Sequence, residues 1–182
     1  MKNITKAETL NFLSLKLKKD NSIIIPKLIF FEKKDFGKNK SSIISEILKK
    51  FSKNIIIRSS AVKEDGHKSS LAGKYKSLKL KNLNRILLEE KITKIIDDFK
   101  NKKDQVIVQD LVENMQLSGV IFTKDPITNS DYYIINYDTS GKTDLVTSGS
   151  KNISMKTIYV YKNKINYSKK FYKILKKIKK IE

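Results

Sequence analysis

The sequence contains no cysteine and no tryptophan, and only 2 of its 182 residues are proline. The absence of cysteine excludes disulfides and thiolate metal sites. No apolar run approaches the roughly 18 residues that a membrane-spanning helix requires. The N-terminus also lacks the apolar core and cleavage site of a signal peptide. We therefore expect a protein without a membrane span, and the cytoplasm is its default location.

Arginine is scarce as well, because only Arg58 and Arg85 are arginines among 39 basic residues. The formal net charge is nevertheless +20, and such a balance is often found in proteins that bind nucleic acid. No recognition motif with stacking aromatics accompanies the lysines. We interpret them as a bias of composition and do not expect nucleic acid to be the main ligand. The charge still favours anions such as nucleotides.

Hydrophobic residues make up 39% of the chain and include 8 Phe and 8 Tyr, which is enough for a folded core. Helical spacing of apolar residues predicts helices over 5–18, 41–51, 83–99 and the last 16 residues. Thr5 is the expected N-cap of the first helix, with Glu8 completing a capping box. The third helix is expected to face inward through Ile86, Leu87, Ile92, Ile95 and Ile96. The last helix is expected to have one apolar stripe of Tyr167, Phe171, Ile174, Ile178 and Ile181.

Apolar and β-branched runs predict strands between these helices. Strands are expected over 22–31, 55–57, 75–80, 105–112, 117–123, 132–137 and 158–161. A helix-rich first half followed by a strand-rich second half predicts an α+β protein with two lobes. We expect the lobes to cover residues 1–103 and 104–182.

Three segments contain residues suited to binding a nucleotide. Arg58, at the end of a predicted strand and followed by two serines, could grip phosphate with its forked guanidinium, or could simply pair with Glu64 or Asp65. The small-residue loop 69–77 would let backbone amides approach phosphates, although as an isolated pattern it is more typical of an ordinary turn. The strands around Gln109 and 117–126 could line a cleft or form a core hairpin.

In this order and spacing, the segments resemble the N-terminal ATP-binding domain of the phosphoenolpyruvate synthase and pyruvate phosphate dikinase family. The resemblance covers nearly the whole chain and is closest in Gly-Val-Ile-Phe-Thr-Lys-Asp-Pro over 119–126. It implies an ATP-grasp-type fold with ATP bound between the two lobes. It also implies which residues contact the nucleotide: Lys6, Arg58, Gly73 and Ser77 for phosphates, Gln109 for adenine, and Thr123 in the second lobe.

The chain departs from the family in one segment. Residues 136–144 stand where synthases usually have Gly-Leu-Gly-Glu, and Asp144 could stand for the glutamate. This variant is similar to a subgroup from capsular polysaccharide loci that includes glutamine kinases. The phosphoacceptor could therefore be pyruvate or an amide such as glutamine. His67, the only histidine, matches no phosphohistidine motif, and we interpret it as a loop residue.

The family's later segments have no counterpart in this chain. They carry an acidic Mg²⁺ ligand, a Gln-x-Arg-Pro motif, a phosphohistidine domain and an acceptor-binding barrel. We therefore expect an incomplete enzyme that needs a downstream polypeptide and does not catalyse turnover alone. The competing hypothesis is a non-catalytic basic protein that binds RNA or an anionic surface, which a lysine stripe unrelated to Arg58 would favour.

Overall fold

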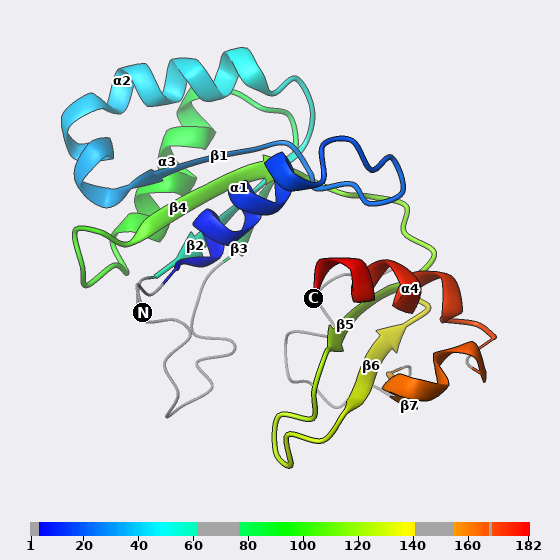
Figure 1. Ribbon diagram of the computed structural model, residues 1–182. Coiled ribbons are helices and arrows are strands. Elements are labelled where there is room, and N and C mark those ends of the chain that lie inside the picture. Colours follow the sequence, from blue (N-terminus) through cyan, green and yellow to red (C-terminus); the bar gives the residue numbers. More distant parts are fainter. Residues whose placement is uncertain (1–3, 62–76, 141–154, 168) are drawn as a thin grey trace. The chain divides into compact units, whose positions relative to one another are not determined.

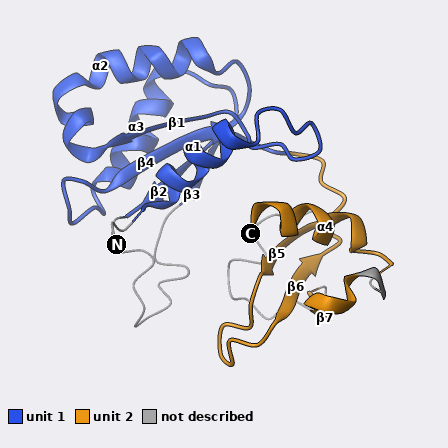
Figure 2. Cartoon of the chain, in the orientation of Figure 1, with its two compact units in different colours: residues 1–112 blue, residues 113–182 orange. Residues whose placement is uncertain are grey.

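The computed structural model describes residues 4–61, 77–140, 155–167 and 169–182 (Figure 1). Helices and antiparallel sheets occur together, so the protein is α+β, as predicted. The chain forms two compact units, Met1–Val112 and Glu113–Glu182 (Figure 2). In the ranges described, no helix has both the length and the apolar character needed to cross a membrane.

The first unit is built on a four-stranded sheet with the order β1-β4-β2-β3. Every pairing in this sheet is antiparallel. The strands are β1 (Leu28–Glu32), β2 (Ile55–Ser60), β3 (Ser77–Leu80) and β4 (Gln105–Asp110). Because β4 lies between β1 and β2, the first unit extends to Val112 and does not end near residue 103 as the sequence predicted.

Three helices accompany this sheet: α1 (Lys6–Lys16), α2 (Lys33–Lys50) and α3 (Arg85–Ile96). The core lies between one face of the sheet and helices α2 and α3, and α1 lies on the other side (Figure 1). The core contains apolar residues from both helices and all four strands, among them Ile44, Ile47, Leu88, Ile92, Ile57, Leu80 and Val108.

Helix α3 does not turn all of its predicted residues inward. Ile86 is 80% exposed and Leu87 is 39% exposed, whereas Leu88, Ile92, Ile95 and Ile96 are buried. The buried positions follow a spacing of four, three and one, which defines a single helical stripe. Ile86 is two residues before the start of that stripe, about 200° around the helix from Leu88. The prediction for Ile86 and Leu87 was therefore wrong.

The second unit contains a three-stranded antiparallel sheet with the order β5-β6-β7. Its elements are β5 (Ser118–Phe122), β6 (Tyr132–Asp138), β7 (Lys156–Tyr161), the 3₁₀ segment η1 (Lys162–Tyr167) and α4 (Tyr172–Ile181). Phe171 and Leu175 pack with Tyr133, Ile135 and Tyr137 of β6 in one buried cluster.

The inward stripe of α4 differs from the predicted stripe at Ile174, and the side chain of Tyr167, the first predicted position, lies outside the described part of the structure. Ile174 is 38% exposed, and Leu175, which the prediction omitted, is fully buried. Phe171 is buried as predicted, and Ile178 packs against the same cluster. The apolar side of α4 is thus covered by the sheet of its own unit.

Candidate functional site

The side of the first sheet that faces away from α2 and α3 is the candidate site. Side chains of a strand alternate between the two faces of a sheet. Ile55, Ile57, Leu80, Val106 and Val108 belong to the core, so their neighbours along the strands stand on the opposite face. We call that side the α1 face, and on β2, β3 and β4 it consists of Ile56, Arg58, Ser60, Ser77, Lys79, Gln105, Ile107 and Gln109.

Three of the predicted nucleotide ligands come together on this face. Arg58 of β2 is paired directly with Ser77 of β3 and, on its other side, with Ile107 of β4. Gln109 is paired with Ile56, which places it diagonally next to Arg58. Long side chains reach their diagonal neighbours in an antiparallel sheet. Residues from three separate sequence segments therefore share one surface.

The N-terminus of α1 is attached to the same face by two buried hydrogen bonds. The hydroxyl of Thr5 donates to Oε1 of Gln105 at 2.6 Å, and the backbone N–H of Ala7 donates to Oγ of Ser60 at 3.1 Å. The capping box predicted between Thr5 and Glu8 is present. Lys6 lies between these two anchored residues and is the first residue of α1. This end of α1 therefore lies at the end of β2, where Ser60 is two residues beyond Arg58 on the same face.

The first amides of α1 already have acceptors within the protein. The N–H of Ala7 is bonded to Ser60, and the N–H of Glu8 donates to Oγ1 of Thr5 at 3.2 Å. Free amides are what make a helix N-terminus attractive to anions. An anion at this end of α1 would therefore depend on the half-buried side chain of Lys6 rather than on these two amides.

Gln109 has an acceptor atom that the described residues leave unused. Only 6% of the residue is exposed, and its buried Oε1 accepts no hydrogen bond from the described residues. A buried polar atom without a partner costs on the order of 1–3 kcal/mol. Gln109 is thus suited to receive a hydrogen bond from a ligand, such as one from an amino group.

The α1 face is accessible in part and predominantly cationic. Ile107 and Gln109 of β4 are buried, Arg58 is half-buried, and Ser77 and Lys79 of β3 are exposed. On the strands of the first sheet, this face has one carboxylate, Glu32 of β1, whose partner across the sheet is Gln105. Glu32 pairs with Lys34 at 2.6 Å. The face can therefore accommodate an anion near β2 and β3.

Thr123 and Gly73 are the remaining predicted ligands. Thr123 follows β5 and belongs to the second unit. Gly73 lies outside the described residues, as do His67 and Asp144.

The turn after Thr123 is ordered by Asp125. Its Oδ1 accepts hydrogen bonds from the backbone N–H groups of Ile127 at 2.8 Å and Thr128 at 3.2 Å. These bonds, first that of Ile127, hold the pKa of Asp125 below its usual value. The Asp-Pro pair after Thr123 is therefore explained by the turn itself.

No cluster of three or more His, Asp or Glu side chains able to hold a metal occurs in the described part of the chain. These residues by themselves do not fit a magnesium site.

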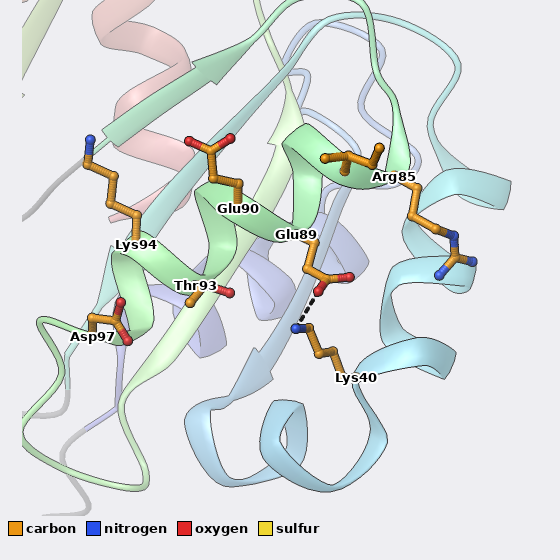
Figure 3. Close-up of a pocket in the computed structure, with 8 residues that line it drawn as sticks. Lys40, Arg85, Glu89, Glu90, Thr93, Lys94 and Asp97 are labelled. Carbon is orange, nitrogen blue, oxygen red and sulfur yellow. Dashed lines mark ion pairs between the residues drawn. The ribbon is translucent and has the colours of Figure 1, made fainter.

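A groove of about 700 Å³ lies against α3, on the side of the sheet away from the α1 face (Figure 3). It is lined by residues of both charges, among them Lys40, Arg85, Glu89 and Asp97, and Lys40 forms an ion pair with Glu89. The mixed charges do not favour an anionic ligand, and none of the predicted ligands lies there.

Sequence reasoning missed Lys79 and Gln105 on the α1 face. The alternation of Ser77 and Lys79 within one strand was readable in the sequence. The pairing of that strand with Arg58 was not, because register depends on contacts distant in sequence.

No protein-family model matches the chain. It is 26% identical over 132 residues to a protein of Bacillus subtilis (strain 168) named "Uncharacterized phosphotransferase YvkC". The match includes 64% of this chain but only 16% of that protein. This similarity supports a distant relationship to a phosphotransferase.

Proposed function

We propose that the chain is the ATP-binding portion of a phosphotransferase of the phosphoenolpyruvate synthase and pyruvate phosphate dikinase type. The observation that carries the proposal is the meeting of Arg58, Ser77 and Gln109 on the α1 face. Each had been selected from a different segment of the sequence. If Arg58 were only a surface residue, if the loop of Ser77 were an ordinary turn and if the strand of Gln109 belonged to a core hairpin, nothing would require the three to share one face.

ATP is the ligand that best matches these groups. The guanidinium of Arg58 can form two parallel hydrogen bonds to a phosphate, and the hydroxyl of Ser77 stands directly across from it. The unpaired Oε1 of Gln109 can accept from the amino group of adenine. Lys6 would add a charge at the end of β2. Gly73 and Thr123 complete the proposed set through the family resemblance.

The activity that we propose for the complete enzyme is the one that the family resemblance implies. A phosphoryl group would pass from ATP to a histidine on another domain and then to pyruvate or an amide such as glutamine, with release of AMP and phosphate. Mg²⁺ would neutralise charge on the phosphates. Because the chain spans only 16% of its relative, a further polypeptide would supply the other steps.

One observation favours the second candidate, a basic protein that binds RNA or an anionic surface. Lys173, Lys176 and Lys180 recur at helical spacing on the exposed side of α4. They belong to the second unit, whereas Arg58 belongs to the first.

Calorimetry with ATP and with single-stranded RNA at about 0.15 M salt separates the two candidates, because surface charges are then screened beyond roughly 8 Å. We expect saturable ATP binding that Gln109→Leu weakens, whereas Gln116→Leu, at an exposed position in the second unit, leaves it unchanged. Tight RNA binding without detectable ATP binding would refute the proposal.

A further inference from the structure

Strand β7 is an edge strand of the second sheet, and its register shows which of its backbone groups face away from β6. The N–H of Lys162 donates to the carbonyl oxygen of Asp131 at 3.0 Å, so these two residues form a hydrogen-bonded pair. Such pairs alternate with non-bonded pairs along an antiparallel ladder. The even-numbered residues of β7 therefore bond to β6. The backbone groups of Thr157, Tyr159 and Tyr161 face the outer edge of the sheet.

These outward groups have no backbone partner among the described residues. The strand runs over Lys156–Tyr161 without proline, glycine or a bulge. The edge of β1 in the first sheet is different, because the outward carbonyl of Leu28 accepts from Nζ of Lys50 at 3.0 Å. Proteins usually shield edge strands in such ways, since an open edge pairs readily with another chain. The edge of β7 is therefore suited to receive a further strand.

The side of the second sheet opposite α4, which we call the open face, is aromatic next to this edge. Phe122, Tyr132, Tyr159 and Tyr161 lie on it and are between 39% and 63% exposed. No lysine or arginine of β5, β6 or β7 stands on this face. Phosphates of a nucleic acid would therefore find no cation on these strands, whereas apolar peptide side chains can pack on the rings.

Cations lie instead near the two ends of the open edge. Lys156 is the first residue of β7, and Lys164 lies in η1 just after it. Both are exposed, and neither forms an ion pair with any described residue. A second copy of this chain would bring the same cations to the edge, with a net charge of +20, and would be repelled. A strand with acidic ends is complementary to this arrangement.

We propose that the edge of β7 binds an extended peptide segment of another protein, with apolar residues at alternate positions and an acidic residue at each end. The peptide adds one strand to the sheet. Its residues opposite Thr157, Tyr159 and Tyr161 pack on the open face, and its acidic ends face Lys156 and Lys164. This site lies in the second unit and does not depend on ATP binding to the α1 face.

The first experiment follows hydrogen exchange of the full chain by NMR, with the end-capped peptide Glu-Val-Thr-Val-Thr-Val-Glu as the probe. We expect the amides of Thr157, Tyr159 and Tyr161 to exchange about tenfold more slowly when the peptide is bound. The amides of Ile158 and Val160 should be protected with and without peptide, because they already bond to β6.

The second experiment compares affinities by calorimetry. A peptide that is N-methylated at its valines keeps every side chain but cannot donate to β7, and we expect it not to bind. Replacing both glutamates with lysine should weaken binding about tenfold through charge repulsion. Tyr159→Pro and Tyr159→Ala both remove the ring, but only proline also removes the outward N–H, at an edge position that tolerates it. We expect the proline variant to bind about tenfold more weakly than the alanine variant.

Unchanged exchange at Thr157, Tyr159 and Tyr161 would overturn the inference, as would equal binding of the N-methylated and unmodified peptides. Equal binding of the peptide with lysine ends would contradict an acidic partner. If these amides become protected without peptide as the protein concentration rises, the occupant is a second copy and the proposal is wrong. Displacement of the peptide by single-stranded RNA would likewise assign the open face to a different partner.

Discussion

Thr5 and Gln105 are separated by 100 positions in the sequence and joined by one buried hydrogen bond of 2.6 Å. The same hydroxyl of Thr5 accepts the N–H of Glu8. One oxygen atom therefore caps α1 and fixes it to β4, which places Lys6 at the α1 face.

Replacing Thr5 with valine keeps the branched shape and removes both hydrogen bonds. We expect the first unit to lose about 1–2 kcal/mol of stability, the range for a lost N-cap with an unsatisfied partner. Urea unfolding measures the loss. Thr9→Val is the control, because the Thr9 hydroxyl donates to the backbone carbonyl of Thr5, the N-cap of the same helix. Equal effects of the two substitutions would contradict the proposed anchoring role.

Replacing Arg58 with lysine should weaken ATP binding although the charge is retained. An ammonium group cannot reproduce the planar two-pronged contact of a guanidinium. We expect a loss on the order of 1–3 kcal/mol in binding free energy. Arg85→Lys is the matched control, since Arg85 donates to Ser45 at 2.8 Å beside the groove on α3. Unchanged ATP affinity in a folded Arg58→Lys variant would remove Arg58 from the site.

Gly119 is required by the close approach of β6. A Cβ atom there would lie 2.5 Å from the carbonyl oxygen of Asn136 and 3.2 Å from Cα of Tyr137. Because these are backbone atoms, Gly119→Ala should force the strands apart and destabilise the second unit by about 1–3 kcal/mol. Hydrogen exchange of the β6 amides measures this effect.

Gly37→Ala is the control for that substitution. Among the described residues, no neighbouring atom lies within 4 Å of a Cβ at Gly37, which is inside α2. We expect this change to stabilise the first unit by roughly 0.5–1 kcal/mol, because alanine loses less backbone entropy in a helix. Similar exchange behaviour in the two variants would show that the contact at Gly119 is not tight.

Tyr133 should make the second unit sensitive to alkali. Burial, followed by its hydrogen bond to Oε2 of Glu182 at 3.0 Å, raises the pKa of Tyr133 to about 12. The ordinary value is about 10. A raised pKa stabilises the fold fully below pH of about 10, and this contribution is lost as pH rises toward 12.

Absorbance of ionised tyrosine against pH tests this expectation. Tyr133→Phe should remove a tyrosine whose pKa is about 12 and lessen the alkaline loss of stability. Tyr159→Phe, at a residue that is 63% exposed, is the control and should leave the alkaline loss of stability unchanged. An equal alkaline loss of stability in both variants would show that Tyr133 does not make the second unit sensitive to alkali.

Local signals in the sequence predicted much of this structure. The capping box of Thr5 and Glu8 and the strand that ends near Arg58 depend on neighbouring residues, and both are present. The prediction of which side of α4 faces inward was wrong at one residue, because Ile174 and Leu175 are equally apolar. Only packing on β6 distinguishes them. The position of Lys79 beside Arg58 required the register of β2 and β3, which no local pattern determines.

The central position of β4 also sets an order of folding during synthesis. Strands β1 and β2 pair with β4 and not with each other. Until residues 105–110 have left the ribosome, β1 therefore has no partner in the sheet and β2 can pair only with β3. Pairing of segments distant in sequence is slow, and unpaired strand edges are prone to aggregation. The nascent chain would therefore carry two apolar strands with incomplete pairing through most of the synthesis of the first unit. Its sheet would close in one late step, which brings Gln109 beside Arg58.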